Sequence, residues 1–238
     1  MRESPIHETK NSFGYLAFIF CLVYVIMAPL KIAHRGFSHQ YGDNNMESFR
    51  KAHDEGFDVI ELDIQINREY DVVVYHDVHH NNNLLLEMSN SECKICGIVF
   101  LRDVFNEFRH SNITLLLDLK GHYDVVNMAL LCVQEHEFPL ERLWFCSFNR
   151  IHLESLINIP MKITIGFISC NVFCSDEYSD LMKNIDFFSC DINTLSKSLV
   201  TQMKEMNKPV FVFTARNNHD IQYIKRFNVD GIISNIFF

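Results

Sequence analysis

The chain has 238 residues, and its 21 lysines and arginines are outnumbered by 30 aspartates and glutamates, which gives a formal net charge of −9. This acidic balance argues against nucleic acid as a partner, because a nucleic-acid-binding surface is rich in basic residues. Hydrophobic residues make up 48% of the chain and charged residues 21%, which excludes a disordered protein. The length corresponds to one domain or two small ones.

An uncharged apolar run comes first. The stretch from Phe13 to Leu30 reads FGYLAFIFCLVYVIMAPL and contains no Asp, Glu, Lys or Arg. A membrane helix needs roughly 17–25 mostly apolar residues, and this run is apolar on every helical face. We therefore predict a tail and a single-pass membrane anchor over residues 1–30, rather than a soluble cytoplasmic protein; the flanking charges do not decide which side of the membrane the rest occupies. The alternative is a buried helix that covers part of the domain over residues 31–238.

Short β-rich runs alternate with helical stretches after residue 31. We predict eight strands, over residues 31–34, 58–66, 113–119, 143–148, 163–168, 185–190, 210–214 and 231–234. Several are continuous apolar runs, as expected for parallel strands buried on both faces. Eight strands alternating with helices over about 200 residues predict an α/β fold, a minimal (β/α)₈ TIM barrel. An open doubly wound sheet is the alternative, but no GxGxxG or P-loop pattern follows any strand.

Helix signals lie between these strands. Asn44 is a candidate N-cap, with Glu47 completing a capping box and Gly56 ending the helix. Near the end of the chain, Asn218 is a candidate cap for a helix over 220–227. Only four residues follow the last predicted strand, so the apolar N-terminal helix is a candidate for the place of the final outer helix.

Charged and imidazole side chains gather where predicted strands end, which is where TIM barrels carry their active sites. In chain order they are His34, Arg35, Glu61, Asp63, His76, Asp118 and Lys120. Glu61 and Asp63 lie two residues apart on one strand and therefore share a face. Carboxylates that point into a barrel need a cation to offset the cost of leaving water.

This inventory suits metal-assisted chemistry on a phosphate ester. Oxygen ligands such as the three carboxylates favour Mg²⁺ or Ca²⁺ over zinc. Two histidines can act as general acid and base, and two cations can stabilise phosphoryl oxygens. Each of these residues alone is also typical of an ordinary solvent-exposed strand face or ion pair. The prediction of a catalytic site therefore depends on their occurrence together at successive strand ends. The lone Cys93-x-x-Cys96 pair predicts no structural zinc.

The stretch over residues 32–77 resembles the opening signature of the glycerophosphodiester phosphodiesterase family. His34-Arg35-Gly36 resembles the family's HRG, Glu61-Leu62-Asp63 its E-x-D and His76-Asp77 its HD, while LLLDLK and FNVDGIISN resemble later segments. The resemblance extends to residue 235 and implies a (β/α)₈ barrel that hydrolyses a phosphodiester with a divalent metal. By position, the resemblance implies that His34 and His76 act as acid and base. It implies that Glu61, Asp63 and Asp118 are metal ligands, and that Arg35 and Lys120 contact the phosphate.

Three places depart from the family pattern. Asp118 stands where the family usually has Glu, Gly42-Asp43-Asn44-Asn45 replaces Pro-Glu-Asn-Thr, and Ser234-Asn235 replaces Thr-Asp. The Asp of the D-L-K strand also resembles the related sphingomyelinase D-type phospholipases, which lack the HRG signature. Both histidines remain, so we expect an active enzyme.

Three functions therefore stay open. The first is hydrolysis of small glycerophosphodiesters to glycerol 3-phosphate and an alcohol. The second is a lysophospholipase D or sphingomyelinase D-type activity on membrane lysolipids, and the third is a non-catalytic relative that binds phosphate-bearing ligands. An N-terminal anchor would hold the end of the barrel opposite the site against the membrane, which favours a soluble substrate.

Overall fold

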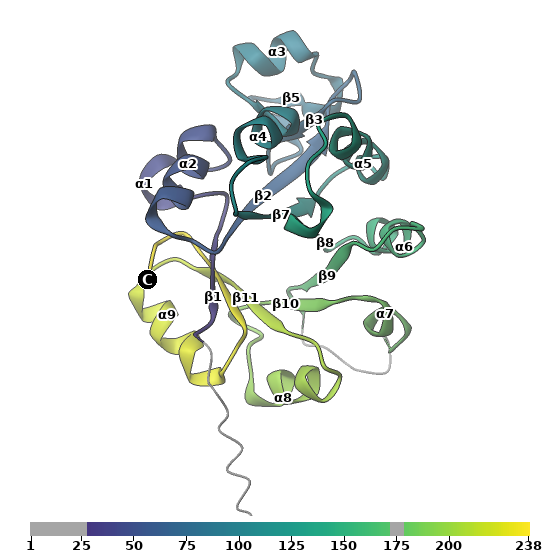
Figure 1. The fold of residues 1–238 in the computed structure, drawn as a ribbon. Helices are drawn as coiled ribbons and strands as arrows, with labels where there is room; N and C mark the ends of the chain where they lie inside the picture. The colour runs from purple at the N-terminus through teal and green to yellow at the C-terminus, as the bar shows by residue number, and fades with distance from the viewer. Residues whose placement is uncertain (1–27, 172–178) are drawn as a thin grey trace, which may run out of the picture.

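Eight parallel strands form a closed barrel in the computed structural model, which describes residues 28–171 and 179–238 (Figure 1). The barrel closes because β1 pairs with both β12 and β2. This confirms the predicted TIM barrel, and the eight predicted strands are present with their ends displaced by at most two residues. The barrel strands are β1 (Leu30–Ala33), β2 (Val59–Ile66), β7 (Thr114–Leu119), β8 (Leu143–Ser147), β9 (Thr164–Ser169), β10 (Phe187–Asp191), β11 (Val210–Ala215) and β12 (Gly231–Ser234).

Helices surround the barrel (Figure 1). Their apolar sides and the outward-facing residues of the strands form the main hydrophobic core. The helices are α1 (Ser38–Tyr41), α2 (Met46–Glu55), α4 (Leu101–Phe108), α5 (Val125–Glu135), α6 (Arg150–Ile157), α7 (Ser179–Asn184), α8 (Lys197–Glu205) and α9 (Asn218–Ile224), with short 3-10 helices at Leu140–Arg142 and Lys225–Phe227.

The interior of the barrel is filled by apolar side chains. The rings of Phe187 and Phe211 lie 4.7 Å apart there, in a cluster that includes Ile32, Val59 and Leu116. A Cβ atom at Gly166 on β9 would come within 2.1 Å of Phe187, so only glycine fits beside this ring. The polar groups at the carboxyl ends of the strands therefore lie on a layer of packed apolar side chains.

A small subdomain is inserted between β2 and β7, at the top of Figure 1. Strands β3 (Val72–Val74) and β6 (Val99–Phe100) extend the sheet antiparallel from the end of β2. The rest consists of a hairpin of β4 (His79–His80) and β5 (Asn83–Leu84), a 3-10 helix at Leu85–Glu87, and α3 (Asn90–Ile95). The subdomain has its own core, which buries Cys93, whereas its sequence partner Cys96 is exposed.

Two predicted helix caps are wrong by one residue. Asn45 caps α2, because its side chain accepts a hydrogen bond from the Ser48 backbone N–H at 2.9 Å. Asn44 lies in the left-handed region with φ 52° and turns its amide elsewhere. Likewise Asn217, not Asn218, caps α9 by accepting from two backbone N–H groups of the first turn. The predicted end of α2 at a left-handed glycine is confirmed.

The predicted membrane anchor lies almost entirely outside the described residues, which begin at residue 28. Within the described residues, none of the helices has the length and apolar character that a bilayer crossing requires. Leu30, the last residue of the predicted anchor, is the first residue of β1. After β12, Ile236, Phe237 and Phe238 pack against the main core.

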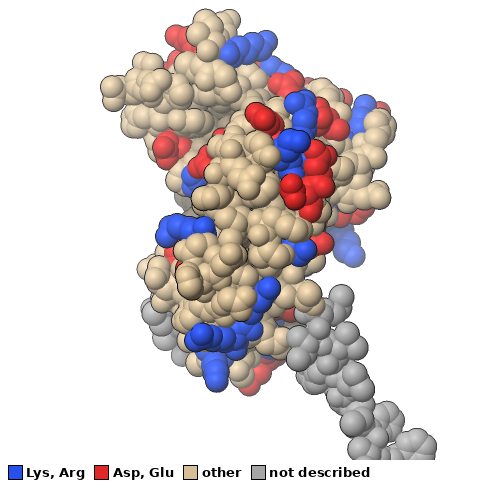
Figure 2. Space-filling model, turned by 90° about the vertical axis from the view of Figure 1, so that its left-hand side faces the viewer, with Lys and Arg blue, Asp and Glu red and all other residues tan. Residues whose placement is uncertain are grey.

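Charged side chains are dispersed over the face shown in Figure 2, where acidic and basic groups lie next to one another between larger uncharged areas. Arg50 on α2 and Glu107 on α4 form a two-point ion pair, with both N···O distances 2.8 Å. Because exposed pairs of this kind contribute about 1 kcal/mol or less, apolar packing holds these helices in place.

Gly36, in the turn after β1, tests how tightly this turn is packed. Its φ is +80°, and a Cβ atom there would lie 2.8 Å from the carbonyl carbon of Ser48. We expect Gly36→Ala to lower the free energy of unfolding by about 3 kcal/mol, from left-handed strain and overpacking. Gly56→Ala is the matched control, because its φ is +86° but no atom lies within 4 Å. That variant should lose only about 1 kcal/mol. Equal losses in urea denaturation would contradict the clash.

Candidate active site

All seven side chains singled out from the sequence line one cavity of about 210 Å³ at the carboxyl ends of the strands. The interior cluster of the barrel supplies its apolar floor, through Leu116 and Ile168 among others. Phe148, Phe213 and Arg216, which the sequence did not indicate, complete its wall. The residues brought together are His34, Arg35, Glu61, Asp63, His76, Asp118 and Lys120.

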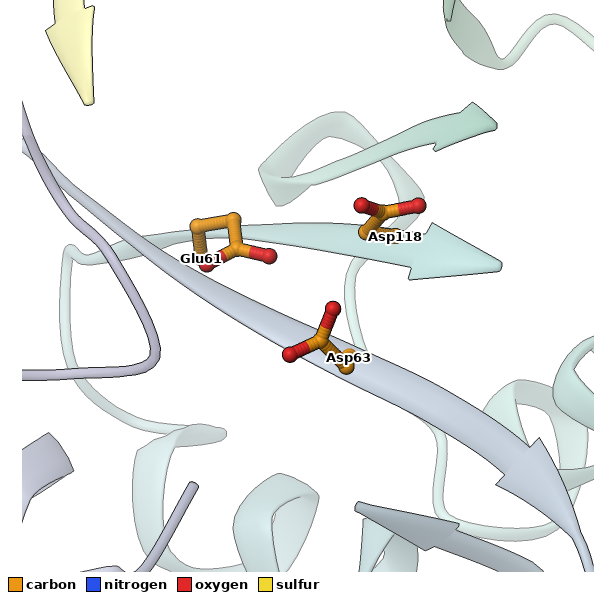
Figure 3. A group of neighbouring side chains, drawn as sticks. All are labelled: Glu61, Asp63 and Asp118. Atoms are coloured by element: carbon orange, nitrogen blue, oxygen red, sulfur yellow. The ribbon is translucent and has the colours of Figure 1, made fainter. Parts of the chain in front are cut away.

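Three carboxylates lie at the centre of this site (Figure 3). Asp63 on β2 and Asp118 on β7 are direct partners in the parallel register of the two strands. Glu61 lies two residues before Asp63 and therefore on the same face. The three residues are buried, and oxygens from all of them lie within 4.8 Å of one another. Such a cluster is unfavourable unless positive charge compensates it.

Two cations compensate Asp63. The Nζ of Lys120 lies 3.3 Å from Asp63 Oδ1 and 2.5 Å from Asp118 Oδ2. The Nε of Arg35 lies 3.1 Å from Asp63 Oδ2. Burial alone would raise the pKa of Asp63, but Lys120 and Arg35 outweigh it and hold this pKa below its ordinary value.

The positive charge and hydrogen bonds around the other two carboxyl groups do not offset their burial. Burial, together with repulsion from Asp63 and Asp118, raises the pKa of Glu61 well above its ordinary value. Burial raises the pKa of Asp118 to about 7 despite its contact with Lys120. The Oδ1 atom of Asp118 is also buried without a hydrogen-bond partner. An unpaired carboxylate oxygen in an acidic cluster fits a divalent cation that prefers oxygen ligands.

His34, at the end of β1, is partly buried beside the last strand. Its Nδ1 lies 2.6 Å from Asn235 Oδ1, so Nδ1–H donates to the amide oxygen and the Nε2 lone pair stays available. Burial and the neighbouring Arg35 charge lower the pKa of His34 to about 4. The imidazole is therefore uncharged at neutral pH. Asn235 is one of the departures from the family pattern, and its place in the sequence alone did not indicate that it belongs to the site.

His76 is held differently. It follows β3, and its side chain is 42% exposed. Its Nδ1 lies 2.7 Å from Asp77 Oδ1. The carboxylate fixes Nδ1 as the protonated nitrogen, so Nε2 is the atom that can exchange a proton with a substrate.

The turn after β1 ties the first strand to the acidic cluster. The backbone N–H of Arg35 donates to Glu61 Oε2 at 2.8 Å, and its Nη1 pairs with Asp43 at 2.8 Å. Asn44, predicted as a helix cap, is instead a residue of the site. Its Nδ2 donates to Asp63 Oδ2 at 2.8 Å, and its Oδ1 accepts from the Asp63 backbone at 3.2 Å. The sequence feature that could have indicated this role is the position of Asn44 within the segment that corresponds to the family's Pro-Glu-Asn-Thr.

A comparison with protein-family models agrees with this geometry. The model described as the glycerophosphoryl diester phosphodiesterase family matches residues 34–115, which contain both histidines and two of the three carboxylates. The chain is similar to this family over that segment. A curated glycerophosphodiester phosphodiesterase from Caldanaerobacter subterraneus subsp. tengcongensis is 24% identical over 231 residues, and the match covers 87% of this chain and 94% of the relative.

Solved structures of similar proteins share the fold. A phosphodiesterase from Oleispira antarctica, in complex with the product sn-glycerol-3-phosphate, is 19% identical with a TM-score of 0.79, and the match covers 87% of this chain and 93% of that one. A glycerophosphodiester phosphodiesterase from Parabacteroides distasonis is 20% identical with a TM-score of 0.77, with 87% and 92% covered. These likenesses support the barrel architecture.

The raised pKa of Asp118 makes the stability of the metal-free protein depend on pH. Its contribution is fully present below the unfolded pKa of about 4 and is lost as the pH rises through the folded pKa of about 7. A bound divalent cation removes this loss. We therefore expect millimolar Mg²⁺ or Ca²⁺ to raise the thermal unfolding midpoint by about 5 °C at high pH and much less at low pH. Scans with metal and with chelator, at about pH 8 and pH 5, measure the difference.

Asp118→Asn is the matched control for this metal effect. It keeps the shape of the side chain but removes a charge and one candidate ligand oxygen, so both the metal effect and its pH dependence should shrink. An unchanged metal-induced shift in this variant would show that the ion stabilises the protein from another site.

Proposed function

We propose that the protein is a metal-dependent phosphodiesterase that cleaves glycerophosphodiesters into glycerol 3-phosphate and an alcohol. The main support is the convergence of two histidines, three carboxylates and two cations on one cavity at the mouth of the barrel. The Caldanaerobacter relative is a glycerophosphodiester phosphodiesterase, and the Oleispira phosphodiesterase binds sn-glycerol-3-phosphate as its product. Both favour this substrate class.

We assign metal binding to Glu61, Asp63 and Asp118, with Mg²⁺ or Ca²⁺ as the ion. When bound, the ion supplies positive charge that polarises a phosphoryl oxygen. The charge balance supports this assignment. Three carboxylates with Arg35 and Lys120 leave one negative charge, which a divalent ion converts into one positive charge. That charge matches the single negative charge of a phosphodiester.

We assign proton transfer to the two histidines. His34, uncharged and with Nε2 free, is suited to take a proton from the attacking water. His76 then delivers a proton from Nε2 to the oxygen of the departing alcohol. A bond from the attacking oxygen to phosphorus forms as the bond to the leaving oxygen breaks, and one proton moves at each end. Arg35 and Lys120 stabilise the charge on the remaining phosphoryl oxygens.

An exposed aromatic residue favours a second candidate, hydrolysis of lysophospholipids by the same chemistry. Phe148 on the cavity wall is 44% exposed, and Tyr123 in the loop after β7 is 58% exposed. An exposed aromatic side chain on the cavity wall, such as Phe148, can contact an acyl chain. The proposed glycerophosphodiesterase and this lysophospholipase D alternative yield different products from different diesters.

Product analysis separates these functions. We expect the protein to release glycerol 3-phosphate from glycerophosphocholine when Mg²⁺ or Ca²⁺ is present, and none after chelation. Lysophosphatidic acid, or its cyclic phosphate, from lysophosphatidylcholine would support the second candidate. If a folded sample forms no metal-dependent product from either diester, the proposal is contradicted. The remaining function is then the non-catalytic binding of phosphate-bearing ligands.

Replacing either histidine tests the acid–base assignment. We expect His34→Ala and His76→Ala each to lower kcat by about 10²–10⁴-fold. Metal affinity should change little, because neither residue belongs to the carboxylate cluster. His79→Ala, at an exposed histidine of β4, is the control and should keep the full rate. A fully active His34→Ala variant would refute its role.

Asn235→Asp tests the environment of His34. A carboxylate facing Nδ1 favours the imidazolium and raises the pKa of His34 from about 4. The base is then lost at a higher pH, so the acid limb of the kcat/KM profile should move up by about one pH unit or more. A profile measured across the acid range gives the shift. An acid limb at the same pH as in the unmodified protein would argue that His34 is not the base.

A further inference from the structure

Gln65 makes three side-chain contacts beside the site, and no role in the site has yet been given to it. It lies two residues beyond Asp63 on β2, on the same face, and is 5% exposed. Its Nε2 lies 2.9 Å from the carbonyl oxygen of Tyr75, 3.1 Å from that of His76 and 2.9 Å from that of Asp77. The two N–H groups of this one amide thus face three successive carbonyl oxygens, and the middle one belongs to His76.

The His76 segment depends on this amide because the sheet ends just before it. Strand β3 stops at Val74, and the Tyr75 N–H donates to the Asp63 carbonyl at 2.9 Å, while the next backbone bond along the chain is the one that the Val78 carbonyl accepts from Leu85. The His76 side chain pairs with Asp77, which lies on the same loop and is 69% exposed. That pair cannot anchor the imidazole to the barrel. The backbone of the loop must do so.

The other end of the Gln65 amide faces the loop that follows Lys120. A Cβ atom at Gly121 would lie 2.9 Å from Gln65 Oε1, and Gly121 has φ +67°. The backbone N–H of Lys120 also donates to the Ile64 carbonyl at 2.9 Å. Gln65 therefore fills the space between the loop with His76 and the loop with Lys120. Both loops therefore contact β2, the strand that carries Glu61 and Asp63.

We propose that Gln65 is a positioning residue that sets where His76 stands relative to the carboxylate cluster. It acts through the backbone of residues 75–77 and touches neither substrate nor metal. The inference rests on the proposed function, because it concerns the proton that His76 transfers. Such a transfer needs heavy atoms about 2.6–3.2 Å apart, and a displacement of about 1 Å can cost about 10²-fold in rate.

A double-mutant cycle on the full chain tests the proposal. Gln65→Met keeps the length of the side chain but removes the donor. We expect it to lower kcat for glycerophosphocholine by about 10²-fold with little change in KM. In the His76→Ala background it should have almost no further effect, because the group it positions is already gone. Equal losses in both backgrounds would show independent damage and overturn the proposal.

Asn67 provides the matched control. It is the next residue on the same face of the chain, is fully buried, and its amide contacts Asn90 in the inserted subdomain at 2.5 Å. Asn67→Ala should lower the free energy of unfolding, and any effect on kcat should be the same with and without His76. Gln65→Asn withdraws the amide by one methylene and should give an intermediate loss. If Gln65→Met does not fold, the cycle is run with Gln65→Asn.

A structural measurement separates failure of this inference from failure of the proposed function. In crystals of Gln65→Met or Gln65→Asn, the His76 backbone should move away from Asp63 by about 1 Å. A protein that hydrolyses no diester but shows this displacement would refute the function and keep the positioning role. An unmoved His76 backbone would overturn the positioning role whatever the activity.

Discussion

The structure depends on one unfavourable arrangement, which is the burial of three carboxylates on neighbouring strands above a dry barrel interior. Repulsion within this cluster explains the contacts around it. Lys120 approaches Asp63 Oδ1 and Arg35 approaches Oδ2. Asn44 donates to the same Oδ2, and the backbone of the β1 turn donates to Glu61. These donors compensate Asp63 but leave Asp118 Oδ1 unpaired. The buried acidic cluster is thus suited to a cation, and without one its internal repulsion opposes folding.

Strand β2 positions most of the groups of the site. Its alternation places Glu61, Asp63 and Gln65 on one face, at successive heights toward the carboxyl end. The lower two belong to the acidic cluster, and the third contacts the His76 loop. Because the inserted subdomain begins by pairing with the end of this same strand, the second histidine belongs to the site through β2 and not through a barrel strand of its own.

The sequence predicts the features that rest on strong periodicity or on strand ends. The eight barrel strands and the seven cavity residues follow from apolar runs and from the charged residues after them. The inserted hairpin was missed because strands as short as His79–His80 and Asn83–Leu84 leave no alternation to detect. Asn44 was misassigned because Asn is favoured both as a helix cap and in the left-handed backbone that it adopts here. Side-chain partners across the barrel, such as Asn235 and His34, depend on closure of the sheet.

The departures from the family pattern are consistent with one another in physical terms. Asp118 is one methylene shorter than the usual Glu, but the β2–β7 register places it directly beside Asp63, so it still reaches the cluster. Asn235 offers His34 an amide oxygen without a negative charge. A carboxylate in its place would add a fourth acidic group to the mouth of the barrel and favour the imidazolium form of His34. The neutral partner orients the same ring nitrogen while leaving the histidine free to accept a proton, so this departure is consistent with the proposed role of His34 as base.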